Sequence, residues 1–201
     1  MSETLGEDKT GGARRRPWMV ALWAVAVIVA AAALYLIVHL LNKPAAPAGP
    51  VFVVTKTYVG SPEPATPILD ANGKTVTLAG FKGKPIIVNL WATWCAPCRK
   101  EMPSLAKLQA SYGDRVLIVP VSMDKAPDRE KARAFIAANA PLAFYEDEAL
   151  AMPYDVKPPV DGFPTTFLFD AQGREVGRIS MDRDWDSPGA HQVVDALIKG
   201  S

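Results

Sequence analysis

The chain has 201 residues, of which 49% are hydrophobic and 21% charged, enough for one domain with a buried core and a further segment. It carries 22 basic and 21 acidic residues, and beyond Pro17 the two kinds are equal in number. A domain without net positive charge lacks the basic surface that nucleic-acid binding requires. We therefore expect partners that are proteins or small molecules, and no nucleic acid. Separately, we expect the chain to be a monomer.

The first predicted element is an apolar helix over residues 18–41, which contains no Asp, Glu, Lys or Arg. As a helix it would be about 36 Å long, against roughly 30 Å for the hydrocarbon core of a bilayer. We expect a retained membrane anchor. The alternative is a cleaved signal peptide, whose apolar region is usually about 7–15 residues long.

The charges that flank this segment predict its orientation. Three arginines at positions 14–16 precede it, and only Lys43 closely follows it. Positive residues are retained on the cytoplasmic side. The sequence therefore predicts a cytoplasmic tail at 1–17, a single-pass anchor at 18–41 in the cytoplasmic membrane, and a remainder that lies outside the cytoplasm.

Residues 42–59 are expected to form a linker, because the stretch NKPAAPAGP is extended and cannot pack. Residues 60–201 form the predicted domain. An Asn-Gly pair at 72–73 between two apolar runs predicts a hairpin. Alternating patterns then predict, in chain order, a strand in PIIVNLW, a helix in APCRKEMPSLAKLQASY, a strand in RVLIVPVSM, a helix in DREKARAFIAANA, strands in LAFYED, TTFLFD and REVGRIS, and a helix in GAHQVVDALIKG. This order predicts an α/β fold, a mixed sheet with helices on both faces.

The chain has only two cysteines, Cys95 and Cys98, at the predicted start of the helix that follows the first buried strand. Free N–H groups at a helix N-terminus favour a thiolate, and residues three apart share a helix face, so the two sulfur atoms can meet. Pro97 between them is tolerated in a first turn. We expect Cys95, as the exposed cysteine, to attack a partner's disulfide, and Cys98 to resolve the mixed disulfide.

The two cysteines allow three other interpretations. A structural zinc site normally needs four ligands, but the two histidines lie in the apolar segment (His39) and near the far end (His191). A structural disulfide that closes so short a loop would add little stability. Two buried cysteines without a role are the third alternative. A redox pair is favoured, because disulfides persist outside the cytoplasm, and it needs no metal and no cofactor since electrons travel through sulfur.

The segment NLWATWCAPCRKEMP resembles the active-site segment of thioredoxin-fold proteins, and specifically of the membrane-anchored TlpA-like thiol:disulfide interchange proteins, which include the cytochrome c maturation reductases. The resemblance extends over about residues 60–200 and also rests on DANGKTVTLAGFKGK, GFPTTFLFD and WDSPGAH. It implies a thioredoxin-like fold, in which a mixed central sheet is flanked by helices, with an N-terminal hairpin and a central insertion.

The same resemblance implies roles for individual residues. It makes Cys95 the nucleophile and Cys98 the resolving thiol. It aligns Pro164 with the family's cis-proline, which lies beside the active-site disulfide, and it makes the backbone of Phe163, with Thr165 beside it, a surface for a substrate strand. The immediate surround of the cysteines is completed by Trp94, Ala96 and Pro97.

One position departs from the thioredoxin pattern. Thioredoxins place a buried aspartate six residues before the first cysteine, but this chain has Asn89, which cannot titrate. Glu101, three residues after Cys98, is the substitute that the TlpA-like group suggests. We expect it to move the proton of Cys98 and to have a raised pKa if partly buried. The alternative is a solvated helix carboxylate.

The predicted function is that of a periplasmic, membrane-anchored thiol:disulfide oxidoreductase. The resemblance implies a reductase of client proteins with disulfides or metal-site cysteines in cytochrome c or cytochrome oxidase assembly, kept reduced by a membrane thiol–disulfide electron donor. A disulfide oxidase or isomerase is the first alternative, because the direction depends on how strongly the thiolate is stabilised. A Cu(I)-binding metallochaperone is the second, since soft thiolates suit that ion, although no third soft ligand is placed near the pair.

Overall fold

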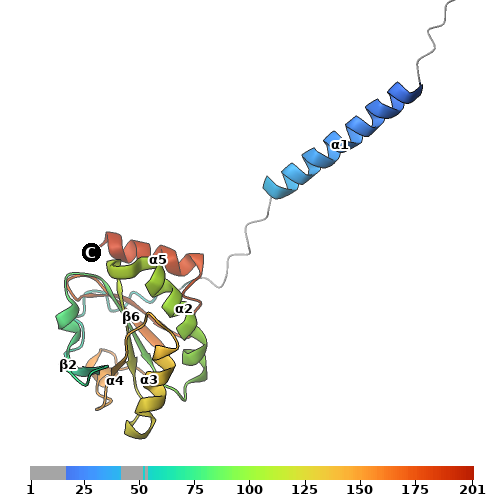
Figure 1. Ribbon diagram of the computed structural model, residues 1–201. Coiled ribbons are helices and arrows are strands. Elements are labelled where there is room, and N and C mark those ends of the chain that lie inside the picture. The colour runs from blue at the N-terminus through green and yellow to red at the C-terminus, as the bar shows by residue number, and fades with distance from the viewer. Residues whose placement is uncertain (1–16, 42–51, 53) are drawn as a thin grey trace, which may run out of the picture. The chain divides into compact units, whose positions relative to one another are not determined.

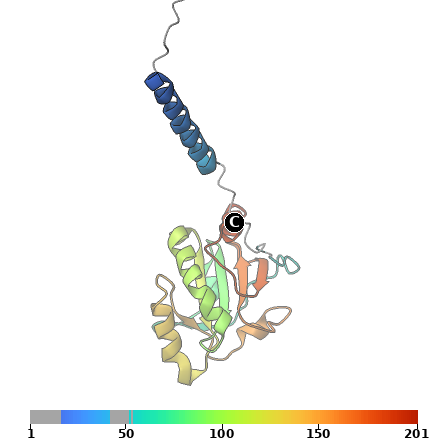
Figure 2. The ribbon, with the colours of Figure 1, turned by 90° about the vertical axis from the view of Figure 1, so that its right-hand side faces the viewer.

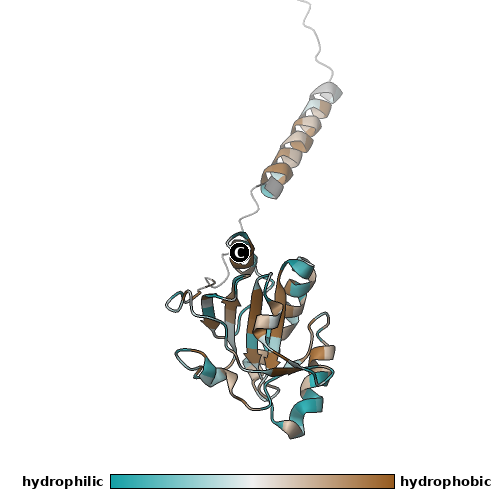
Figure 3. Ribbon diagram, turned by 90° about the vertical axis from the view of Figure 1, so that its left-hand side faces the viewer, coloured by the Kyte–Doolittle hydropathy of each residue, from teal (hydrophilic) through white to brown (hydrophobic). Residues whose placement is uncertain are grey.

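The computed structural model describes residues 17–41, 52 and 54–201. They belong to two separate units, an N-terminal helix and a domain. The helix, α1 (Pro17–Leu41), is predominantly hydrophobic along its length (Figure 3). Within it, Ala21–His39 is long and apolar enough to cross a membrane. The predicted apolar helix is therefore present with nearly the predicted bounds.

The domain is built on a mixed sheet that has seven strands within residues 54–201 (Figure 1). The strand order is β2-β1-β5-β4-β3-β6-β7. The central strands β3, β4 and β5 are parallel, and the remaining pairs are antiparallel. The strands are β1 (Ile68–Asp70), β2 (Thr75–Val76), β3 (Ile86–Trp91), β4 (Leu117–Ser122), β5 (Tyr145–Glu146), β6 (Thr165–Phe169) and β7 (Glu175–Ser180).

The three longer helices of the domain fall close to their predicted places, whereas a short fourth one was not predicted. The α-helices are α2 (Ala96–Tyr112), α3 (Arg129–Ala137), α4 (Met152–Asp155) and α5 (Pro188–Lys199). Three short 3-10 helices join them: η1 (Leu78–Phe81), η2 (Gly113–Arg115) and η3 (Ala126–Asp128). The stretch between β4 and β6, which contains α3, β5 and α4, is the predicted central insertion.

Two of the longer helices share one face of the sheet. Asn89 and Trp91 are two residues apart on β3 and therefore point to the same face. Asn89 donates a hydrogen bond to Glu101 on α2, and the ring of Trp91 packs against Phe135 on α3, with 5.3 Å between centroids. Figure 2 shows α2 and α3 on the same side of the strands. The crossovers β3-α2-β4 and β4-α3-β5 step across the sheet in one direction, and right-handed crossovers then place both helices on one side.

The third long helix joins them, because Tyr112 at the end of α2 donates a hydrogen bond to Asp195 on α5. The sequence predicted helices on both faces. On the opposite face, the short helix η1 covers part of the sheet, where Phe81 packs edge-on against Tyr145 of β5, with 5.7 Å between ring centroids. Helices therefore flank the sheet on both faces, as predicted. The first turns of α2 lie next to the segment that joins β7 to α5, because Glu101 accepts a hydrogen bond from the backbone N–H of Arg183.

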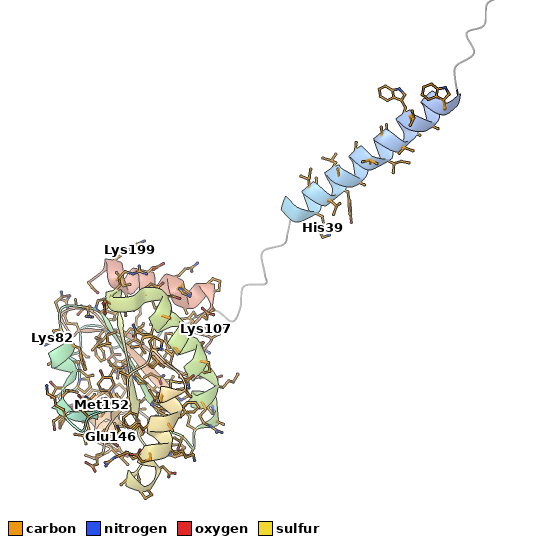
Figure 4. The ribbon with its side chains drawn as sticks, viewed as in Figure 1. His39, Lys82, Lys107, Glu146, Met152 and Lys199 are labelled. Carbon is orange, nitrogen blue, oxygen red and sulfur yellow. A yellow bond between two sulfur atoms is a disulfide. The ribbon has the colours of Figure 1, made fainter. Side chains whose placement is uncertain are left out.

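The core lies between these layers. Every residue of β3 is buried, and so are all but the first of β4. Figure 4 shows side chains filling the space between sheet and helices, with Met152 inside and Lys82, Lys107 and Lys199 at the surface. The largest fully buried side chains are Trp91, Trp185, Phe167, Phe169, Ile68 and Leu78.

The domain begins earlier than the sequence predicted. We call Phe52 together with residues 54–63 the edge segment, because it lies along the outer edge of β7. Thr55 exchanges two backbone hydrogen bonds with Arg178, and Gly60 donates another to Glu175. Residues 54–59, assigned to the linker from the sequence, therefore belong to the domain. The rest of the predicted linker, 42–51 and 53, lies outside the described residues.

Candidate active site

The two cysteines form a disulfide in the first turn of α2. Cys95 is the N-cap residue, and its sulfur accepts a hydrogen bond from the backbone N–H of Cys98, at 3.3 Å. Pro97 occupies the first turn without disturbing the helix. The prediction that the two sulfur atoms meet at a helix N-terminus is confirmed.

The exposure of the cysteines needs one correction. Cys95 was predicted to be exposed, but it is only 5% exposed, and Cys98 is fully buried. The disulfide turns the sulfur of Cys95 inward, toward a buried partner. Cys95 is still the more accessible of the two, and its neighbours Trp94, Ala96 and Pro97 are exposed.

The turn before β6 lies beside this helix start. The peptide bond between Phe163 and Pro164 is cis, as predicted. The Phe163 ring lies 5.8 Å from the ring of Trp94, centroid to centroid. Thr165 is the first residue of β6 and pairs with Leu90, near the end of the strand that leads to Cys95. The structure thus brings together the two segments that the sequence assigned to the site.

A cavity of about 710 Å³ opens next to Trp94 and Phe163. Its volume is within the range of ligand and side-chain pockets. Apart from those two residues, no residue that lines the cavity was predicted from the sequence. The other walls come from the central insertion and the turn that follows it. These walls are formed by Met123, Lys125, Asp128, Leu150, Pro153, Tyr154, Val160, Asp161 and Gly162.

Glu101 is buried on the same face of α2 as Cys98, and only 2% of it is exposed. Its Oε1 accepts a hydrogen bond from Asn89 Nδ2 at 2.8 Å. Its Oε2 accepts two more, from the backbone N–H of Arg183 at 3.0 Å and from Trp185 Nε1 at 3.1 Å. The alternative of a solvated carboxylate is therefore wrong.

Burial raises the pKa of Glu101 to about 7, because the charged carboxylate loses water. The hydrogen bonds from Arg183, Asn89 and Trp185 favour the charged form and act in the opposite direction, and the nearby charge of Asp182 adds to the rise. A carboxyl group with such a pKa can both accept and release a proton near neutral pH. The sequence predicted the raised pKa, but not the groups that set it.

A second buried carboxylate positions the loop that leads to the cysteines. Asp124 accepts hydrogen bonds from the backbone N–H of Thr93 at 2.9 Å, from the Thr93 hydroxyl at 2.7 Å and from the Ser122 hydroxyl at 2.9 Å. Thr93 immediately precedes Trp94 in the chain. The sequence analysis missed this contact, because a lone aspartate after a strand carries no signal of its partner.

Comparison with known proteins shows that the chain is similar to thioredoxin-like proteins and thiol–disulfide oxidoreductases. The model of the AhpC/TSA family matches residues 59–174. The thioredoxin-like protein YneN of Bacillus subtilis is 33% identical over 117 residues, which are 57% of this chain and 66% of that protein. The thiol-disulfide oxidoreductase ResA of the same organism is 35% identical over 120 residues, 58% of this chain and 64% of that protein. The matches thus span slightly less than two thirds of these two relatives.

Other relatives are matched over more of their length. ResA of Bacillus anthracis is 30% identical over 127 residues, 62% of this chain and 70% of that protein. Among solved structures, a thiol:disulfide interchange protein DsbE from Chlorobium tepidum has a TM-score of 0.61 and 27% identity, and the similarity covers 70% of this chain and 97% of that one. A thio-disulfide isomerase from Thermus thermophilus has a TM-score of 0.57 and 25% identity, with 71% and 96% covered.

Proposed function

Because the chain belongs to the AhpC/TSA family of thioredoxin-like proteins, we propose that it is a thiol:disulfide oxidoreductase that works through Cys95 and Cys98. The observation that carries the proposal is the disulfide at the N-terminus of α2, where Cys95 is 5% exposed, beside exposed neighbours, and Cys98 is fully buried. An accessible nucleophile beside a buried resolving thiol is the arrangement that stepwise exchange needs.

In the proposed reaction, the reduced protein transfers two electrons to a disulfide of a client protein. The Cys95 thiolate, stabilised by the N–H groups at the start of α2, attacks one client sulfur and releases the other as a thiolate. The Cys98 thiolate then attacks the sulfur of Cys95, which frees the second client thiol and forms the Cys95–Cys98 disulfide. The client disulfide is reduced to two thiols, and the protein dithiol is oxidised.

Glu101 would accept the proton of Cys98 before the second step. Cys98 is fully buried, so bulk water cannot take its proton directly. Glu101 is three residues further along the same helix face, and its pKa of about 7 suits proton transfer near neutral pH. Phe163 and Thr165, on either side of Pro164, would offer backbone groups to the client strand.

We further propose that the protein is a reductase anchored in the cytoplasmic membrane with its domain in the periplasm. The apolar helix α1 and the arginines that precede it support this placement. The resemblance to TlpA-like proteins supports clients with disulfides or metal-site cysteines in cytochrome c or cytochrome oxidase assembly, and a membrane thiol–disulfide donor as the source of electrons.

The reduction potential of the Cys95–Cys98 pair is the experiment that tests the direction. The full chain in detergent is equilibrated against glutathione or dithiothreitol, and the fraction of reduced protein is measured. We expect a value near or below that of thioredoxin, about −270 mV. A value near −120 mV would make the protein a disulfide donor instead.

An isomerase is the second candidate, because one similar structure is that of a thio-disulfide isomerase. An intermediate potential, together with refolding of a substrate that carries scrambled disulfides, would favour it. Titration of the reduced protein with Cu(I), with a Cys98→Ser variant as control, tests the copper-binding alternative.

A further inference from the structure

We propose that Trp185 is a positioning residue for Glu101: its indole N–H fixes one carboxylate oxygen, and its ring, covered by Phe52, keeps water from the carboxylate. The inference bears on catalysis only through the proposed role of Glu101 in exchange. Trp185 lies in the connection between β7 and α5, a segment that has no role in the proposed function.

This connection is attached along one face of α2. Lys100 pairs with Asp182 at 2.9 Å, and Lys107 pairs with Asp186 at 3.2 Å. Between these two pairs, the backbone N–H of Trp185 donates to the hydroxyl of Ser104 at 3.0 Å. Residues 100, 104 and 107 of a helix lie on one face, so the segment 182–186 is held at three successive points.

The attachment places Trp185 directly on the carboxylate. Trp185 is fully buried, and its Nε1 lies 3.1 Å from Oε2 of Glu101. The backbone N–H of Arg183 reaches the same oxygen at 3.0 Å, while Asn89 holds Oε1. Three donors therefore fix both carboxylate oxygens in one orientation.

Phe52 of the edge segment packs against the indole of Trp185. The two rings meet edge to face, with 5.0 Å between centroids at an angle of 74°. A β-carbon at Gly189 would lie 3.2 Å from Cβ of Phe52, so the glycine allows the close approach of residue 52. The cover over Glu101 thus includes residues from both ends of the domain.

Trp185 acts on Glu101 in two opposite ways. Its N–H stabilises the charged carboxylate, whereas its ring excludes water and so favours the neutral acid. Asp182 and Lys100 are the charged groups on the elements that pack around Glu101. Asp182 opposes ionisation of Glu101, and Lys100 is paired with Asp182. Arg183 faces the carboxylate with its backbone N–H. Substitutions that remove the donor and substitutions that open the cover should therefore shift the titration of Glu101 in opposite directions.

The test is a titration of the Glu101 carboxyl carbon by NMR, on the oxidised full chain in detergent micelles, with Glu101→Gln to assign the signal. Trp185→Phe keeps most of the bulk but loses the donor, and we expect the titration midpoint to rise by about one pH unit. Phe52→Ala opens the cover, and we expect the midpoint to fall. Trp91→Phe is the matched control, because Trp91 is also fully buried but its Nε1 has no hydrogen-bond partner among the described residues.

An unchanged midpoint in Trp185→Phe, or an equal shift in Trp91→Phe, would overturn the proposal. If Trp185→Phe does not fold, Phe52→Ala tests the proposal instead. An unchanged or raised titration midpoint of Glu101 in Phe52→Ala would then contradict the proposal. The titration does not depend on catalysis, so the two proposals can fail separately. A shifted midpoint without a matching shift in the pH profile of the exchange rate would support the role of Trp185 and contradict that of Glu101 in exchange.

Discussion

At position 89 this chain has an amide where thioredoxins have a carboxylate, and the structure shows what the amide does. Asn89 Nδ2 donates both to Glu101 and to the hydroxyl of Thr166, each at 2.8 Å. The buried carboxyl group therefore lies on α2, and the amide on β3 orients it. Asn89 and Glu101 form one unit, which the sequence analysis could suggest only as two separate positions.

The pKa of Glu101 makes stability depend on pH with a definite sign. Its folded value of about 7 lies above the ordinary value of 4.5, so the unfolded chain loses this proton first as pH rises. We expect the wild type to lose about 3 kcal/mol of stability relative to Glu101→Gln between pH 4.5 and 7. Urea unfolding of both proteins over this range measures the difference, and parallel profiles would contradict the buried titration.

The unequal burial of the two cysteines predicts which one captures a client. In Cys98→Ser, Cys95 can still attack but the mixed disulfide cannot be resolved, so we expect a stable adduct with a disulfide-containing client peptide. In Cys95→Ser, the remaining thiol is fully buried and should form little adduct. Non-reducing electrophoresis and mass spectrometry distinguish the two variants. Equal adduct from both would show that burial does not select the nucleophile.

Residues of the site differ in how far the sequence could predict them. Cys95, Cys98 and Glu101 lie within two turns of one helix, so their spacing alone brings them to one face. Trp185 and Asp124 reach the site from 84 and 31 residues away in the chain. Such contacts depend on the packing of distant elements, for which no local pattern exists.

At the scale of elements, Arg178 joins three parts of the structure. It forms a two-point ion pair with Glu175 on β7, with both N···O distances 2.7 Å. Its remaining N–H groups donate to the carbonyls of Lys157 and Pro158, before β6. Its guanidinium also lies over the ring of Tyr58 in the edge segment, 4.3 Å from the centroid. The loop before β6 ends in the turn that carries Phe163, so this contact supports one wall of the active site.

Breaking this ion pair should destabilise the domain strongly. Both partners are buried, so Arg178→Met leaves the carboxylate of Glu175 without its countercharge, at a cost of about 3–5 kcal/mol. Removing the charge on both sides, in Arg178→Met with Glu175→Met, should recover much of that loss. Urea unfolding of the two single variants and the double variant measures the coupling. Additive effects would show that the pair contributes little.

The edge segment shows why one boundary was misplaced. The Pro/Ala stretch suggested a linker up to residue 59, although VFVVTKTYV at 51–59 is rich in the β-branched and aromatic residues that favour extended pairing. Within the domain, by contrast, the buried strands and capped helices had clear periodic patterns, and their predicted places are confirmed to within a few residues.

For the whole molecule, the path of the chain accounts for both the site and its surroundings. The family resemblance predicted the central insertion, but the cavity beside Trp94 could not be predicted, because its walls come from segments as distant as Met123 and Phe163. The grouping of the long helices on one face follows from the handedness of two successive crossovers, which the order of elements alone did not reveal.

The membrane orientation is the remaining whole-molecule prediction. Three arginines precede α1 and only Lys43 closely follows it, and a disulfide-exchanging domain works where disulfides persist. Alkaline phosphatase, which folds only in an oxidising compartment, should be active when fused after residue 201, and a fluorescent protein that folds only in the cytoplasm should be dark there. Replacing the arginines at 14–16 by serine while adding three lysines after Lys43 should reverse both signals. A phosphatase fusion that is inactive in the native chain would place the domain in the cytoplasm, where a reducing pool would compete with the proposed electron donor.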